Sequence, residues 1–362
     1  MDLKFLRASV CLAMAAGLVL SPKLWLTQRS YPLVPIADWF PAIPAPLDAV
    51  LYWLLIVLAV FGIRSQIAIT AFVALLFAVA LGDQTRWQPW AYQYFWMLFA
   101  LAFCSCDSAL NACRFILVAT YVWSGVQKYN ASFASDIYPW VTVPLMQFAP
   151  QSWQGVLKAQ GWTAALAECA IGLMLLIPRL RLAGLVLAIA MHVGLLVCLG
   201  PWGHNWNGIV WPWNMAMIAF DLALFANTRT VPALGVLTPS RGTAIVALLF
   251  GVMPLASFYG RWDAYLSLAL YSGNTIHSRV ILSDDALAKL PAEVSTLAVR
   301  NEINLAAWAM QELHVPAYPT RRVSRGVALK LTELVPGPVI LEIDECPDWR
   351  TGERAVTRVT FR

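Results

Sequence analysis

Apolar residues form long runs along this chain, and the charged residues fall mostly between the runs. A helix needs about 20 apolar residues to cross a bilayer. The pattern predicts nine spans, several of them short, at about 6–21, 48–63, 66–82, 90–106, 110–127, 161–178, 181–199, 207–226 and 242–259. We therefore expect an all-α polytopic membrane domain over residues 1–270.

The first apolar run has the shape of a signal peptide, because Lys4 and Arg7 precede it. No clear small-x-small cleavage site stands before a polar mature start. We therefore interpret this run as a retained first span.

From about Ser272 the composition changes to that of a soluble domain. Ser283 begins a short capped helix, and residues 301–314 and 321–334 have the periodicity of amphipathic helices. Residues 339–343 and 355–361 alternate like strands. Residues 271–362 are therefore expected to form a small α+β domain.

Basic residues such as Arg64, Arg114 and Arg179 lie in alternate breaks between the predicted spans. They share one side with Lys4 and Arg7, and positive residues mark the cytoplasmic side. With nine spans, the N-terminus lies inside and the C-terminal domain outside. The expected location is a bacterial inner membrane.

The amino-acid composition excludes some classes of binding partner for this chain. The chain is 60% hydrophobic and only 12% charged, which excludes a single soluble domain of this size and makes the lipid bilayer its surroundings. The net charge of +5 is spread thinly, without a basic stripe, so no nucleic-acid partner is expected. The seven cysteines show no metal-ligand spacing, and no metal site is predicted.

Most of the 17 tryptophans fall in loops predicted to face outward. They roof a cavity, or they anchor the chain at the headgroups as interfacial aromatic residues commonly do. The candidate ligand-binding residues in this region are Trp90, His204, Asn205, Trp211 and Trp213. For His204 and Asn205, formation of a turn is the alternative.

An uncharged run over residues 115–126 leads to Lys128, which sits where a predicted span meets its outer rim. Lysines in such places often only extend to the headgroups, but an ionisable residue there is a functional candidate. Tyr121, Trp123 and Tyr129 flank it and are candidate ligand-binding residues.

Glu168 and His192 lie within consecutive spans, seven residues after Gly161 and eight before Gly200. At about 1.5 Å per residue both lie roughly 10–12 Å below the outer surface. With Lys128 they form a candidate catalytic group. A protonated Glu168 and a neutral core His192 are the structural alternatives, and Asp221 is expected near the inner end of its span, where it stabilises the topology.

Lysine bases are usually made by removing the amine from water, whereas a carboxylate in contact holds the ammonium form. Direct contact between Glu168 and Lys128 would therefore indicate an ion pair instead of a free base.

Tyr121, Ser124, Gly125, Lys128 and Phe133 fit the pattern Y-x-x-[SA]-G-x-x-K-x-x-x-x-[FW]. This segment resembles the one that carries the catalytic lysine of vitamin K-dependent gamma-glutamyl carboxylases and their bacterial HTTM (horizontally transferred transmembrane) relatives. Residues 166–177 and 211–215 are similar to two further segments of that superfamily, and the resemblance covers about residues 50–270.

The resemblance implies a reduced, vitamin K-like quinone as cofactor, with Lys128 as the base that deprotonates it. The first hypothesis is thus a lyase- or oxidoreductase-type membrane enzyme acting on a quinol or similar amphipathic molecule, quinone or lipid, in an outward-facing cavity. The second is a non-catalytic accessory subunit, similar to DoxX and HTTM proteins, whose C-terminal domain docks a periplasmic redox or other protein. A transporter has less support because the sequence shows no internal repeat.

Overall fold

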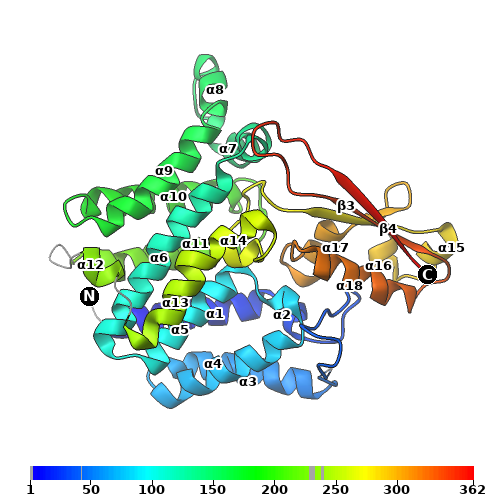
Figure 1. Cartoon of the computed structure of the whole chain (residues 1–362), viewed down its shortest axis with the longest axis horizontal. Helices are drawn as coiled ribbons and strands as arrows, with labels where there is room; N and C mark the ends of the chain where they lie inside the picture. Colours follow the sequence, from blue (N-terminus) through cyan, green and yellow to red (C-terminus); the bar gives the residue numbers. More distant parts are fainter. Residues whose placement is uncertain (1–2, 42, 228–232, 238–239) are drawn as a thin grey trace.

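The computed structural model describes residues 3–41, 43–227, 233–237 and 240–362. Helices dominate the chain, and a small sheet lies near its C-terminus (Figure 1). The longer helices are α1 (Leu3–Leu20), α3 (Leu47–Gly62), α4 (Gln66–Leu81), α5 (Pro89–Phe103), α6 (Cys106–Lys128), α9 (Gly161–Leu176), α10 (Arg181–Leu199) and α11 (Val210–Phe225). Shorter helices are α2 (Pro22–Trp25), α7 (Tyr138–Met146), α8 (Gln151–Lys158), α12 (Ala233–Leu237), α13 (Ala244–Ala247) and α14 (Met253–Ala256). The expected helical class and the mixed character of the tail are confirmed.

The predicted spans are helical, but several are short for a bilayer. Within the described residues, α1, α6, α10 and the broken helix Arg241–Tyr259 are long and apolar enough to cross, and the pair α8 and α9, bent by 64°, adds a fifth at most. The helices α3, α4 and α11 have 16 residues each. That is about 24 Å of helix against roughly 30 Å of hydrocarbon. Membrane-spanning character is supported, whereas the number of nine spans is not confirmed.

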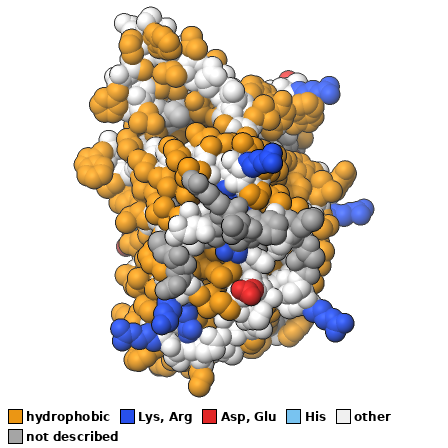
Figure 2. Space-filling view, turned by 90° about the vertical axis from the view of Figure 1, so that its left-hand side faces the viewer, with side chains coloured by type: hydrophobic (Ala, Val, Ile, Leu, Met, Phe, Trp, Pro, Cys, Tyr) orange, Lys and Arg blue, Asp and Glu red, His pale blue; other side chains and the backbone are white. Residues whose placement is uncertain are grey.

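The helical part has two opposite ends. At the end with the N-terminus, Arg7 Nε donates a hydrogen bond of 2.7 Å to the carbonyl of Gly62 and ties α1 to α3. At the other end, the backbone N–H of Ala131 donates to the carbonyl of Trp349, at 2.9 Å. Lys128, three residues before Ala131, therefore lies on the side of the C-terminal segment. Figure 2 looks at the first end, which is largely apolar with scattered Lys and Arg side chains and little acidic surface.

The C-terminal sheet is antiparallel throughout, with strand order β2-β1-β3-β4. Its strands are β1 (His277–Ile281), β2 (Glu302–Asn304), β3 (Val339–Asp344) and β4 (Val356–Phe361). Alternate residues of β3, namely Val339, Leu341 and Ile343, are buried, as a half-buried strand requires. The helices of this segment are α15 (Asp284–Leu287), α16 (Ala292–Ser295), α17 (Leu305–Leu313) and α18 (Arg321–Thr332).

The two predicted strands and the cap at Ser283 are confirmed, because Ser283 Oγ accepts from the N–H of Ala286 at 3.2 Å. The helix predicted from residue 301 begins later, at Leu305. Asn304 Oδ1 accepts from the N–H groups of Ala306 and Ala307 and caps the helix there, while residues 302–304 pair with β1.

Candidate functional site

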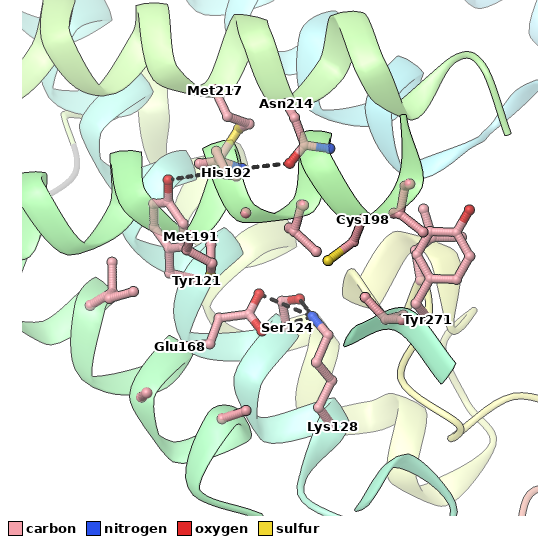
Figure 3. Close-up of a pocket in the computed structure, with 18 of the residues that line it drawn as sticks. Tyr121, Ser124, Lys128, Glu168, Met191, His192, Cys198, Asn214, Met217 and Tyr271 are labelled. Carbon is pink, nitrogen blue, oxygen red and sulfur yellow. Dashed lines mark hydrogen bonds and ion pairs between the residues drawn. The ribbon is translucent and has the colours of Figure 1, made fainter. Parts of the chain in front are cut away.

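A cavity of about 620 Å³ lies among α6, α9, α10 and α11, with α7 along one side (Figure 3). Apolar side chains such as Val141, Ile171 and Leu195 form most of its wall. The polar side chains that line it are Thr120, Tyr121, Ser124, Lys128, Glu168, His192, Asn214, and also Tyr138, Thr142, Trp213 and Tyr271. An apolar cavity with a few converging polar groups is the usual form of a small-molecule site.

The first polar group in the cavity is the pair Lys128 and Glu168. Lys128 Nζ lies 2.8 and 3.0 Å from the two carboxylate oxygens of Glu168, and also donates to Ser124 Oγ at 2.5 Å. The two charged side chains are only 14% and 13% exposed, so the pair is largely withdrawn from solvent. In this structure the ammonium is an ion-pair partner and not a free amine.

Small residues bring the two helices of this pair together. A Cβ atom added to Gly125 of α6 would lie 2.5 Å from Cys169 Sγ and 2.6 Å from the carbonyl oxygen of Ala165, both in α9. One at Gly172 of α9 would lie 2.9 Å from the carbonyl oxygen of Val118. Glycines at such crossings let membrane helices pack backbone to backbone. The close crossing allows a lysine of α6 to reach a glutamate of α9.

The second polar group is a hydrogen-bonded network centred on Tyr121. Its hydroxyl is hydrogen-bonded to His192 Nε2, at 2.7 Å, and to Asp221 Oδ2, at 2.5 Å. His192 Nδ1 lies 2.7 Å from Asn214 Oδ1. Figure 3 shows the bonds of His192 to Tyr121 and Asn214 set apart from the lysine and glutamate. The structure thus joins helices α6, α10 and α11 through one buried chain of polar atoms.

The three predicted catalytic residues all line this one cavity, although they do not form a single cluster. Lys128 and Glu168 are in contact, and His192 belongs to the second network. Of the predicted ligand-binding residues, Tyr121 and Trp213 line the cavity. Trp213 Nε1 donates to Gln93 Oε1 at 2.8 Å, which holds the indole in place.

The other six predicted ligand-binding residues do not line the cavity; they are Trp90, Trp123, Tyr129, His204, Asn205 and Trp211. Trp90 is buried against Gly17 in the helical core. Tyr129 is 43% exposed and its ring stacks edge-on with Trp162.

The polar side chains of the predicted roof bond to the neighbouring helices α7 and α10. The imidazole of His204 stacks on the Trp140 ring, with centroids 4.6 Å apart, and its Nε2 bonds the Trp140 carbonyl oxygen at 2.6 Å. Asn205 is exposed and has a φ of 49°, a left-handed turn conformation. Trp211 Nε1 donates to the carbonyl oxygen of Leu199. The side chains of His204 and Trp211 therefore tie the loop to α7 and α10 and are engaged there.

Sequence reasoning did not assign Asn214 to the site and placed Asp221 elsewhere. Asp221 lies near the end of α11, as expected, and the structure adds that it is fully buried and bonded to Tyr121. The signal was present: two polar residues seven positions apart in an apolar helix lie on one face, two turns apart. Tyr121, Ser124 and Lys128 follow the same spacing in α6.

Fold and site together define a helical protein of membrane-spanning character. Its apolar cavity contains the ion pair of Lys128 and Glu168 and borders the hydrogen-bonded network around Tyr121. Within the described part of the chain, no group of three or more His, Cys, Asp or Glu side chains is placed to hold a metal ion. Comparisons with protein-family models, with curated proteins and with solved structures found no match to this chain.

Proposed function

We propose that this chain is a membrane enzyme of the carboxylase-like type, which binds a quinol or a similar amphipathic small molecule in the cavity among α6, α9, α10 and α11 and removes a proton from it. The single observation that carries the proposal is the cavity itself, about 620 Å³, with apolar walls and two buried polar groups. An amphipathic ligand with a ring hydroxyl matches this arrangement. The apolar part of such a ligand packs against the apolar wall of the cavity, and its hydroxyl forms hydrogen bonds with the polar side chains.

By the family resemblance, Lys128 is the proposed base. Its ion pair with Glu168 sets a condition on that role. The ammonium bonded to Glu168 cannot accept a proton. Lys128 can do so only after it has given up a proton, either to Glu168 or, once Glu168 has turned away, to water. Without such a change, Lys128 acts as a positive charge beside the ligand oxygen.

Bound ligand tests the proposal directly. Native mass spectrometry and lipid extraction of the purified protein should find a quinone in the wild type. Lys128→Ala should lower its occupancy tenfold or more, a loss of about 1.4 kcal/mol. Lys158→Ala, which removes an exposed lysine of α8, is the matched control and should retain the quinone.

Lys128→Arg separates charge from basicity, because arginine stays protonated in proteins. If Lys128 is the base, this variant should bind the quinol and lose proton abstraction from it. Full deprotonation of the quinol by this variant would show that Lys128 is not the base.

A second candidate function is an accessory subunit that docks an extracytoplasmic protein. It is favoured by β4, which lies at the free edge of the sheet and exposes Val356, 54% accessible, and by the exposed Trp349 of the preceding loop. Edge strands are sites for strand addition by a partner. No bound quinone in any variant, together with a protein captured by the wild type and lost in Val356→Lys, would favour this function.

The proposed topology places nine spans in a bacterial inner membrane, with the N-terminus inside. It is supported by helix ends that meet at two opposite ends of the molecule and by the scattered Lys and Arg side chains on the face in Figure 2. Two exposed native thiols test it, Cys106 at the start of α6 and Cys346 after β3. In intact spheroplasts a membrane-impermeant maleimide should label Cys346 and not Cys106, with Cys346→Ser and Cys106→Ser assigning the signals. Labelling of Cys106 before permeabilisation would contradict the orientation.

A further inference from the structure

Asp221 is connected to the cavity only through Tyr121 in the part of the chain that the structure describes. Its side chain is fully buried in α11 and does not line the cavity. Oδ2 bonds the Tyr121 hydroxyl, and Oδ1 is a buried oxygen without a hydrogen-bond partner. An acid held this way in an apolar interior is a functional candidate, because burial without a cationic partner is costly.

The position of one proton follows from Asn214. Its Nδ2 donates to the carbonyl oxygen of Val210 at 2.7 Å, so its Oδ1 faces His192. An amide oxygen can only accept, and His192 Nδ1 must therefore carry a proton and donate. The other ring nitrogen, Nε2, faces Tyr121.

The remaining hydrogen bonds require one additional proton, which Asp221 and His192 share through Tyr121. If Asp221 were ionised and His192 neutral, both would need to accept from Tyr121, whose hydroxyl has a single proton. One additional proton resolves this conflict. It lies on Asp221, so that the acid donates to Tyr121 and Tyr121 to His192, or on His192, with Tyr121 donating to the carboxylate.

We infer that Asp221, Tyr121 and His192 form a proton relay that takes up the proton released by a hydroxyl-bearing ligand in the cavity, with Tyr121 as the group that contacts the ligand. This inference rests on the proposed function for the identity of the ligand as a hydroquinone. It adds a destination for the proton that does not require Lys128 to leave its ion pair.

The step balances from either starting arrangement. The ligand hydroxyl donates to a free lone pair of Tyr121 Oη. Its O–H bond breaks, the electron pair stays on the ligand oxygen, and a new O–H bond forms at Tyr121. The proton that Tyr121 held moves to whichever neighbour lacked one, His192 Nε2 or Asp221 Oδ2.

Both routes end in the same state, with Asp221 protonated and His192 an imidazolium. Tyr121 then accepts from both neighbours and donates its own proton to the ligand anion, so every polar atom between them is satisfied. The ligand's negative charge is matched by the imidazolium, and the Lys128 and Glu168 pair elsewhere in the cavity has no net charge.

The ligand-free protein provides the first test. Infrared spectroscopy of the Asp221 carboxylic C=O stretch, assigned by its loss in Asp221→Asn, and ¹⁵N NMR of His192, assigned with His192→Gln, should together report one shared proton. An ionised Asp221 beside a neutral His192, or a proton on each without ligand, would overturn the relay. Tyr92→Phe is the matched control, because it removes a buried hydroxyl that bonds none of these groups.

The second test adds decylubiquinol, with its dimethyl ether as a ligand that has no proton to release. Decylubiquinol should increase both the carboxylic C=O signal of Asp221 and the imidazolium signal of His192, because each group then carries a proton. The dimethyl ether should change neither signal. Tyr121→Phe should still bind ubiquinol by calorimetry but lose the response, whereas Tyr92→Phe should keep it. Binding without a response in the wild type, or a response that survives in Tyr121→Phe, would overturn the relay alone. Absence of ubiquinol binding would overturn the proposed function and proton uptake together.

Discussion

At the residue scale, the lysine and glutamate of the cavity depend on each other. With side chains only 14% and 13% exposed, either charge left alone would be poorly solvated. We predict that Lys128→Met and Glu168→Gln each destabilise the protein by about 3 kcal/mol, the cost of breaking a buried pair. The double variant should lose clearly less than the sum, because no uncompensated charge remains.

Reversible unfolding of detergent-solubilised protein measures this cycle, with Lys158→Met as a control for removal of a lysine from the surface. Strictly additive losses would show that the two side chains do not stabilise each other.

The candidate site was partly predictable at this scale. The rule that ionisable residues in membrane segments are functional candidates identified Lys128, Glu168 and His192, and helix rise placed the last two at a common depth. All three line one cavity. The separation of His192 from the pair was not predictable, because it depends on hydrogen bonds to Tyr121 of α6 and Asn214 of α11, contacts between helices that no local pattern records.

At the scale of elements, the crossing of α6 and α9 decides whether the ion pair can form. The atoms that a Cβ at Gly125 would meet include the backbone nitrogen of Cys169, 2.6 Å away, and backbone cannot yield as a flexible side chain does. Gly125→Ala should therefore push the helices apart and cost about 1–3 kcal/mol, as overpacking does. The contact between Lys128 and Glu168 should weaken with it.

Gly155→Ala is the matched control, because nothing lies within 4 Å of the added atom in the exposed helix α8. This change should be neutral or stabilise the protein by about 0.5–1 kcal/mol. Thermal unfolding of the two variants provides the comparison, and equal losses would show that the crossing is not tightly packed.

The elements themselves were largely predictable because apolar runs mark helices in a membrane protein. The predicted span 181–199 coincides with α10, and most other boundaries agree within a few residues. Whether a run crosses a bilayer depends on its length, and the 16-residue helices α3, α4 and α11 are shorter than the about 20 residues that a straight span needs. The strand β2 was missed because three residues carry too short an alternation, and its pairing with β1 comes from a contact distant in sequence.

At the scale of the whole molecule, one carboxylate makes several of the hydrogen bonds that attach the C-terminal segment to the helical part. Glu312 of α17 accepts from the backbone N–H groups of Ser30 and Tyr31, at 2.6 and 2.8 Å, and also bonds the Ser30 hydroxyl. Burial alone would raise the pKa of Glu312, but these hydrogen bonds outweigh it and lower the pKa below its usual 4.5. The ionised form is therefore the one that holds the junction.

The sign of the pH dependence follows from this lowered pKa. The ionised carboxylate stabilises the junction fully above pH 4.5, and the contribution is lost as the pH falls through the lower, folded-state pKa. We predict that acid increases hydrogen exchange in α17 and in residues 24–31, and that Glu312→Gln shows increased exchange already at pH 7. A loss of about 1.5–3 kcal/mol is expected for hydrogen bonds to a charged group.

The sheet weakens in the same range, because hydrogen bonds from Arg358 and Arg279 lower the pKa of Glu342 against the opposing effect of its burial. A comparison of Glu312→Gln with a control variant separates the acid response of the Glu312 junction from that of the sheet. Glu312→Gln should remove the part of the acid response that is specific to α17, while Glu333→Gln, an exposed glutamate of the same segment, should keep it. An unchanged acid response of α17 in Glu312→Gln would show that Glu312 contributes no net stability to the attachment and that the other contacts of the C-terminal segment hold it in place.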